Sequence, residues 1–142
     1  MSRKKHQGAC LCGAVSFEIT GRIGHIWVCH CRECRKQTGH VVAASAVQDK
    51  DLALSGSEHI CWYESSQKAR RGFCRNCGSV LFFKVKASPN TSIMAGAFEP
   101  EPPFKIAEHW WLSEKGSYYE LAEKDAALFQ KNGGSYCFTV KP

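Results

Sequence analysis

The chain has 142 residues and a net charge of +6, with 44% hydrophobic and 23% charged residues. This is the composition of an ordinary globular protein, so we expect a single domain over residues 1–142. No apolar run approaches the roughly 20 residues that cross a bilayer, and no apolar segment of a secretory signal follows the basic N-terminus. We therefore expect a cytoplasmic protein with no membrane partner.

Most of the chain has the residue pattern of short strands. Over residues 11–20 the apolar side chains fall on odd positions and polar ones on most even positions, which indicates a strand with one buried face. Residues 118–130 have weak helical spacing, and the Pro-rich residues 99–104 predict a rigid loop. Further β-branched or aromatic strand candidates are residues 25–29, 40–47, 52–56, 59–63, 79–85, 91–96, 104–112 and 136–140. The sequence thus predicts a mainly antiparallel β domain.

The nine cysteines are an odd number at tight spacings, which favours metal ligands over disulfides. Cys10 and Cys12 are two residues apart, so on a strand both side chains would point to the same face. Cys74 and Cys77 form a Cys-x-x-Cys turn, and the following Gly78 can adopt the positive φ that such a turn needs. Together the two pairs supply four thiolates, the closed shell of a structural zinc. The alternative, a redox-active dithiol at Cys74 and Cys77, lacks the helix that follows such motifs.

Cys29, Cys31 and Cys34 form a second cluster with only three thiols. Three protein ligands and one open position are typical of a reactive zinc site. Spacing alone leaves other sortings of the cysteines open, and it also leaves open an iron–sulfur cluster. Cys61 is a further candidate ligand of this second ion, although for Cys61 and Cys137 we favour the role of small buried hydrophobic residues.

Three segments together resemble the glutathione-dependent formaldehyde-activating enzyme (GFA) family, which also includes centromere protein V. They are GACLCGAVSFEI, CHCRECRKQTG and GFCRNCGSVLFF, which begin at residues 8, 29 and 72 and contain the seven clustered cysteines. Weaker likeness in LALSGSEHICWYES, IMAGAF and FKIAEHWWL extends the resemblance from about residue 7 to residue 112.

The resemblance implies an Mss4-like fold of stacked antiparallel sheets that zinc stabilises. It implies two zinc ions per chain, a structural one on the four paired cysteines and a catalytic one on the three-cysteine cluster. The implied reaction is the reversible addition of the glutathione thiol to formaldehyde. The protein would then be a carbon–sulfur lyase that acts on glutathione or a related thiol adduct.

Cations close to the second cluster would balance its thiolates and bind carboxylates of a substrate. Arg32 and Arg35 lie within and directly after this cluster, so they are our candidates for substrate binding. Lys68, Arg70 and Arg71 form a basic stretch that could serve the same purpose.

Three histidines are considered for a chemical role at the predicted site. His30 stands between two ligands, so we expect it to point away from the metal if the segment is extended. His40 and His109 are candidates for an acid–base role, but a lone histidine on a strand is more often packed or hydrogen-bonded. The four tryptophans are expected in the core or in pocket walls.

The main alternative is a non-catalytic zinc-stabilised binding module that holds nucleic acid through its basic half. Residues 1–71 contain eleven Lys and Arg against six Asp and Glu, which suits nucleic acid or a small anionic substrate equally. The open three-thiol shell favours an enzyme, since a binding module needs closed sites only. The sequence also lacks a basic patch interleaved with aromatic residues. We therefore expect a small thiol such as glutathione as the partner, rather than nucleic acid.

Overall fold

The computed structural model describes residues 4–126 and 129–131, and their strands form two sheets. The small sheet has the order β1 (His6–Ala9), β2 (Ser16–Ile19) and β5 (Leu52–Ser55). The large sheet has the order β11 (Phe129–Lys131), β10 (Ile106–Trp110), β3 (Ile26–Cys29), β4 (Val42–Gln48), β9 (Asn90–Met94), β8 (Val80–Val85), β7 (Ala69–Cys74) and β6 (Ile60–Tyr63). The predicted mainly β fold with stacked sheets is confirmed.

Helices are short and stand at the ends of strands. The two α-helices are α1 (Arg32–Thr38) and α2 (Glu123–Ala126). Single turns of 3₁₀-helix occupy Asp49–Asp51, Ser57–His59, Ala95–Ala97 and Leu112–Glu114. Within the described ranges, none of these helices has the length and apolar composition of a membrane span.

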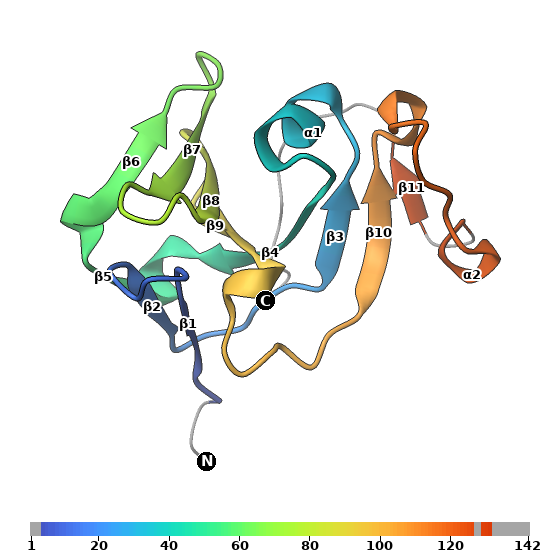
Figure 1. The fold of residues 1–142 in the computed structure, drawn as a ribbon. Coiled ribbons are helices and arrows are strands. Elements are labelled where there is room, and N and C mark those ends of the chain that lie inside the picture. Colours follow the sequence, from blue (N-terminus) through green and yellow to red (C-terminus); the bar gives the residue numbers. More distant parts are fainter. Residues whose placement is uncertain (1–3, 127–128, 132–142) are drawn as a thin grey trace.

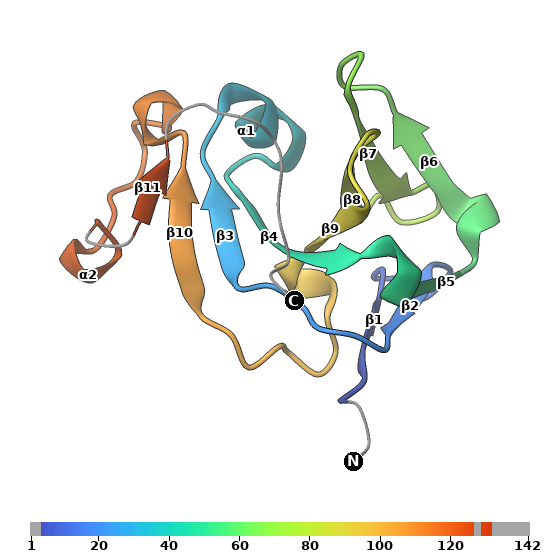
Figure 2. The ribbon, with the colours of Figure 1, turned by 180° about the vertical axis from the view of Figure 1, so that it is seen from behind.

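The large sheet is antiparallel except at one edge, where β10 pairs in parallel with both β3 and β11. The parallel β3–β10 pair follows from the route of the chain, because a long connection leaves β9 and passes below β3 before β10 begins (Figure 1). Figures 1 and 2 show the small sheet and β6–β8 on one side of the molecule, and α1, β3 and β10 on the other. Strand β4 runs between these two sides.

The apolar core consists of two clusters, each of which surrounds one group of cysteines. The first lies between the small sheet and β7–β9, where Phe17 packs edge-on against Phe82 and Phe98 at ring-centroid distances of 6.3 and 5.2 Å. It includes Cys10 and Cys74. The second contains Trp27, Phe83, Met94 and Trp110 together with Cys29 and Cys34. Both cysteine groups are therefore built into packed apolar surroundings, which limit the movement of their side chains.

The expected helix at residues 118–130 is mostly wrong. Only Glu123–Ala126 are helical, and Phe129–Lys131 form β11 instead. The Lys115 side chain donates to the backbone carbonyls of Gly116 and Tyr119 at the start of this segment. The strand expected at 136–140 lies outside the described residues.

Candidate metal centre

Cys10, Cys12, Cys74 and Cys77 come together in space, with all four Sγ atoms within 4.8 Å of one another. The Sγ atom of Cys12 lies 3.6 Å from that of Cys10 and 3.8 Å from that of Cys74. Zinc–sulfur bonds of about 2.3 Å in a tetrahedron place the sulfurs about 3.8 Å apart. The donor atoms and their spacing therefore fit a single zinc-sized ion.

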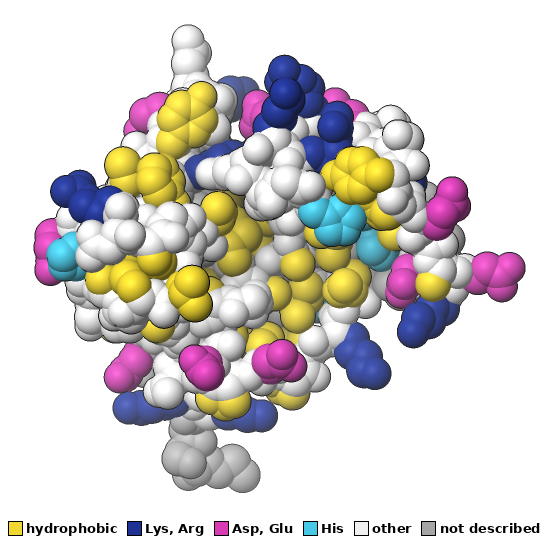
Figure 3. Space-filling view, viewed as in Figure 1, with side chains coloured by type: hydrophobic (Ala, Val, Ile, Leu, Met, Phe, Trp, Pro, Cys, Tyr) yellow, Lys and Arg dark blue, Asp and Glu magenta, His cyan; other side chains and the backbone are white. Residues whose placement is uncertain are grey.

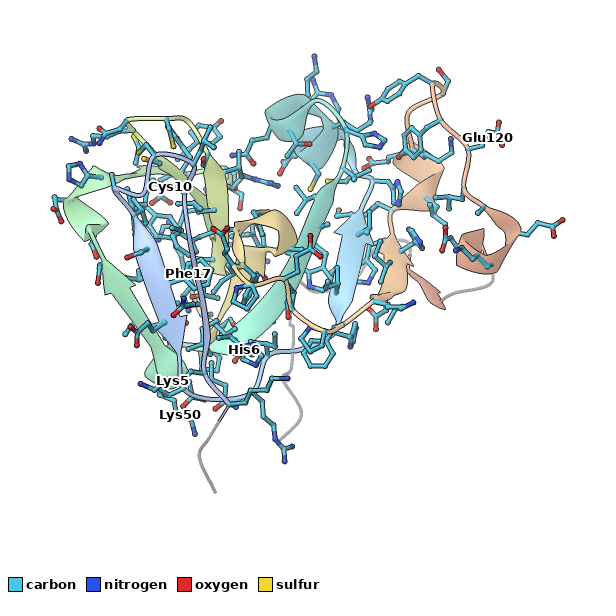
Figure 4. The ribbon with its side chains drawn as sticks, turned by 60° about the horizontal axis from the view of Figure 1, so that its bottom comes forward. Lys5, His6, Cys10, Phe17, Lys50 and Glu120 are labelled. Carbon is cyan, nitrogen blue, oxygen red and sulfur yellow. The ribbon has the colours of Figure 1, made fainter. Side chains whose placement is uncertain are left out.

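Two tight turns bring these four cysteines together. Gly13 has φ 80° and its N–H donates to the Cys10 carbonyl at 3.0 Å, while Gly78 has φ 76° and its N–H donates to the Cys74 carbonyl at 2.8 Å. Strand β1 ends at Ala9, so the expected strand geometry for the first pair is wrong. The reason is that Cys10 and Cys12 lie in a tight turn closed by the Gly13 hydrogen bond, and this turn directs both thiols to the same point without a strand. In Figure 4, Cys10 stands at one end of the small sheet.

The four-cysteine cluster joins the small sheet to the large sheet. The N–H of Leu11 donates to Ser79 Oγ at 3.0 Å, across the two turns. Ser79 Oγ also lies 3.1 Å from Cys77 Sγ, and this hydrogen bond lowers the pKa of Cys77 to about 5. A thiol with a lowered pKa is more readily available as the thiolate that binds metal.

Cys29, Cys31 and Cys34 form a second group, again with the Sγ atoms within 4.8 Å of one another. Cys29 ends β3, Cys31 caps the N-terminus of α1, and Cys34 lies in its first turn. The N–H of Cys34 donates to Cys31 Sγ at 3.4 Å. A hydrogen bond with Cys29 lowers the pKa of Cys31, and the same bond raises the pKa of Cys29.

Helix α1 explains how three close cysteines meet at one point. Residues three apart on a helix are neighbours, so its first turn places the Cys34 side chain beside the capping Cys31. The helix ends at Gly39, which has φ 84° and whose N–H donates to the Arg35 carbonyl. Among the described His, Cys, Asp and Glu residues, no fourth ligand joins the group. Cys61 lies instead on β6, at the opposite edge of the large sheet.

A small pocket opens onto the three sulfurs, and four of its nine lining residues are aromatic. Its lining residues are Trp27, Cys29, Cys31, Cys34, Val42, Arg71, Phe83, Trp110 and Trp111. Trp27 and Trp110 stack with their ring centroids 4.9 Å apart. Trp111 has φ 58° and ψ 42°, which is strained for a bulky residue, and such strain often occurs at functional sites. The pocket is thus an apolar space with three sulfurs at one wall.

Arg71 is the one charged side chain among the described residues that line this pocket, and it is only 5% exposed. Its Nη1 lies 3.8 Å from Cys34 Sγ and donates to Gln37 Oε1 at 2.9 Å, while its Nη2 is 3.1 Å from Glu33 Oε2. Burial lowers the pKa of Arg71, but Cys34 and Glu33 raise it by more, so the guanidinium stays charged. A buried cation therefore stands directly beside the predicted thiolates.

Of the basic stretch, only Arg71 reaches the three-cysteine cluster. Alternate residues of β7 face opposite ways, and Arg70 lies over the Trp62 ring at 4.1 Å instead. Lys68 is exposed before the strand begins. Arg71 stands two residues after the buried Ala69, so both side chains lie on the same face of β7. The sequence analysis did not predict β7, and so it could not place Arg71 on the buried face of a strand.

Arg32 and Arg35, the two candidates for substrate binding, lie in different surroundings. Arg32 lines a surface basin between α1 and the β6–β7 turn, and Arg35 is not among its walls. The basin is lined by Arg32, Glu33, Lys36, Gln37, Tyr63, Ser65 and Arg71. Since Glu33 is paired with Arg71, an excess of positive charge remains there. Figure 3 shows Lys and Arg side chains gathered at the top of the molecule, above α1.

A larger groove passes the four-cysteine cluster and the connection after β9. It is lined by Gln7, Ala9, Cys10, Leu11, Ile26, Ser79, Val80, Leu81, Met94, Ala95, Gly96, Ala97, Phe98, Glu99, Pro100, Glu101, Pro102 and Phe104. Its charged walls are the carboxylates of Glu99 and Glu101, and the described lining contains no Lys or Arg. An anionic ligand is thus better served by the basin beside α1.

His30 points away from the cysteines, as the alternation along the chain predicts. Its ring contacts Tyr119 and His109. His40 is exposed and packs against the rings of Tyr118 and Tyr119. None of the three histidines joins either cysteine group.

The fold and the site define a class: a mainly β protein with one closed and one open cysteine cluster. The model of the glutathione-dependent formaldehyde-activating enzyme family matches residues 5–114. The chain belongs to this family.

Two known proteins are similar to this chain. An uncharacterized lyase of Schizosaccharomyces pombe is 28% identical over 121 residues, which are 84% of this chain and 88% of that protein. A crystal structure of a Rhodobacter sphaeroides protein superposes with a TM-score of 0.58 and 21% identity, over 88% of this chain and 98% of that one. The second likeness concerns the fold alone.

Proposed function

We propose that this protein is a zinc-dependent enzyme of the carbon–sulfur lyase type, acting on glutathione or a related thiol adduct. The observation that carries the proposal is a group of three sulfurs at the wall of a pocket, with no fourth ligand among the described residues. Family membership and the lyase-named relative support the same class of reaction.

Zinc fits both cysteine groups, so we propose two zinc ions per chain. Thiolates are soft ligands that select zinc or iron–sulfur clusters among the common metals. The iron–sulfur alternative is less suitable because its cysteines surround a body of several atoms, whereas each group here converges on one point. At the open cluster, bound zinc would lower the pKa of a thiol in its fourth position and act as a Lewis acid.

The proposed reaction makes and breaks one carbon–sulfur bond. In the forward direction the substrate sulfur attacks the aldehyde carbon, the carbonyl π pair moves to oxygen, and the oxygen takes up the proton that the thiol loses. The reverse reaction returns the free thiol and the aldehyde. Atoms and electrons balance with no oxidant or reductant.

The residues around the open cluster have distinct proposed roles. Cys29, Cys31 and Cys34 hold the ion, and the charge of Arg71 offsets part of the negative charge that a fourth thiolate would add. The stacked Trp27 and Trp110 exclude water from one side of the pocket, which strengthens electrostatic interactions within it.

We place the carboxylates of the substrate in the basin beside α1. Arg32 and Lys36 contribute positive charge there, and Arg71 lines both the basin and the pocket. A thiol whose sulfur lies in the pocket would thus extend past Arg71 towards Arg32. Arg35 lies outside the basin and is the weaker of the two predicted candidates. A reducing compartment such as the cytoplasm suits a thiol substrate and the free cysteines of this chain.

Exchange NMR tests the proposed reaction. With ¹³C-formaldehyde and glutathione at equilibrium, the zinc-loaded protein should speed up the exchange between the free aldehyde and its thiol adduct. Cys31→Ser, which leaves the four-cysteine cluster complete, should return the rate to that of buffer. A wild-type rate equal to the buffer rate would contradict the proposal. Glutathione binding without exchange, or binding of a nucleic-acid duplex in its place, would favour a non-catalytic binding module.

A further inference from the structure

His30 is the residue between two of the three cysteines, and it is held on every side. It is 1% exposed, which makes it one of the most deeply buried polar residues in the described part of the chain. Its backbone N–H donates to the Trp110 carbonyl at 2.9 Å. Its ring Nδ1 is hydrogen-bonded to the Tyr119 hydroxyl, and its Nε2 lies 2.9 Å from Nδ1 of His109.

The three side chains form a continuous hydrogen-bonded chain. An imidazole ring has two nitrogens, and in its neutral form one of them donates and the other accepts. Tyr119 and His109 can each act as donor or acceptor, so both nitrogens of His30 are used in either direction of the chain. The orientation of the ring is therefore fixed at two points.

This arrangement is costly for a structural core. His109 is 4% exposed, and its Nε2 has no hydrogen-bond partner among the described residues. Burying an unpaired polar atom costs free energy, and apolar side chains of similar size would avoid this cost. The presence of the pair calls for a benefit other than packing.

That benefit lies in the position of the neighbouring cysteines. Cys29 pairs with Trp110 in the parallel β3–β10 ladder, and Cys31 begins α1. His30 is the central residue of the turn that links strand β3 to helix α1, and so it stands between these two cysteines. Lys115 fixes the far end of the chain, because its Nζ bonds to the Tyr119 carbonyl and lies 4.3 Å from the centroid of the Tyr119 ring.

We propose that Tyr119, His30 and His109 form a positioning chain that holds Cys29 and Cys31 at the spacing of the three-thiolate site. The inference rests on the proposed second metal site. It assigns no role in the reaction to these residues: they act through the cysteines. The affinity of the second cluster for metal should then depend on the chain, and that of the first cluster should not.

Tyr119→Phe tests this with the removal of a single hydroxyl. The matched control is Tyr118→Phe, since the neighbouring Tyr118 is 62% exposed and its hydroxyl donates to the Gly39 carbonyl at 3.3 Å rather than to His30. Zinc affinity is measured for both clusters by competition with a chromophoric chelator, and the thiolate-to-cobalt bands of the Co²⁺-loaded protein report the geometry of the second cluster.

We expect Tyr119→Phe to weaken the second cluster about tenfold or more, as for other residues that orient metal ligands, and to leave the first cluster unchanged. Tyr118→Phe should change neither. Equal affinity of Tyr119→Phe and wild type at the second cluster would overturn the inference alone. So would an equal loss at both clusters, which would indicate a general effect on stability. A wild-type protein that binds only one ion would overturn both the inference and the proposed function.

Discussion

The two cysteine clusters contain the same kind of ligand but differ in how the chain supplies it. The first draws on two turns, and Cys12 and Cys74 are 62 residues apart in the sequence. The second takes all its ligands from residues 29–34. The free-energy cost of closing a loop in the unfolded chain grows with its length, by on the order of 2 kcal/mol between these two cases. We therefore expect a metal at the first cluster to stabilise the fold more than a metal at the second.

Their surroundings differ in the same direction. The first cluster is supported by backbone turns and by Ser79, and it joins two sheets. The second has a pocket, a buried cation and a buried pair of histidines beside it, which are features that stability alone does not require. A complete ligand shell that joins distant parts of the chain is expected of a structural metal site. An incomplete shell built from one short segment is expected of a reactive site.

The largest expected effect is that of Cys77→Ser, which opens the closed cluster. The binding free energy of a structural zinc is on the order of 10 kcal/mol, comparable to the whole stability of a domain this size. We expect the variant to unfold or aggregate. Cys31→Ser, the matched change at the open cluster, should keep the fold and lose one zinc. Thermal melts and elemental analysis measure both, and equal disruption by the two changes would remove the distinction between the clusters.

Arg71→Gln should have an intermediate effect that concerns only the open cluster. It removes the cation beside Cys34 and leaves Glu33 without its partner. The loss of the Arg71 hydrogen bonds to Gln37 and Glu33 should lower the free energy of unfolding by about 1–3 kcal/mol, and the second metal should bind more weakly. Arg70→Gln is the control, since Arg70 lies over Trp62 on the other face of the same strand. Urea unfolding that showed equal losses for both variants would contradict this role of Arg71.

The smallest effect is expected for Arg32→Ala, which removes one positive charge from the basin. Exposed charge pairs contribute about 1 kcal/mol or less, so glutathione binding should weaken a few-fold and become less dependent on salt. Arg35→Ala should change the affinity less, because Arg35 lies outside the basin. Calorimetry at two salt concentrations distinguishes the variants, and a larger effect at Arg35 would move the carboxylate site to the other side of α1.

Local patterns could be predicted from the sequence, and tertiary contacts could not. Spacing predicts a group of four cysteines and a group of three but leaves other sortings open, and the contact between the two distant pairs of the first group is seen only in the structure. The seven-residue helix α1 was missed because its cap is a cysteine rather than the usual Ser, Thr, Asp or Asn. Strand β7 was missed because its residues ARRGFC show no clear alternation, and the role of the buried Arg71 can be recognised only once its contact with Glu33 of α1 is known. Tyr119 was assigned to a helix from the local spacing of residues 118–130. Its contact with His30, 89 residues earlier, and its contact with the Lys115 side chain cannot be recognised from that spacing.

X-ray absorption at the zinc edge tests most directly whether the second cluster is open to a thiol. The clusters supply seven cysteine sulfurs for two zinc ions. When glutathione is added at millimolar concentration, the total should rise from seven sulfurs towards eight as the substrate thiol enters the open position. The same experiment on Cys31→Ser should show no such rise. An unchanged zinc spectrum in the wild type, with both ions bound, would contradict the central claim that this cluster binds a thiol substrate.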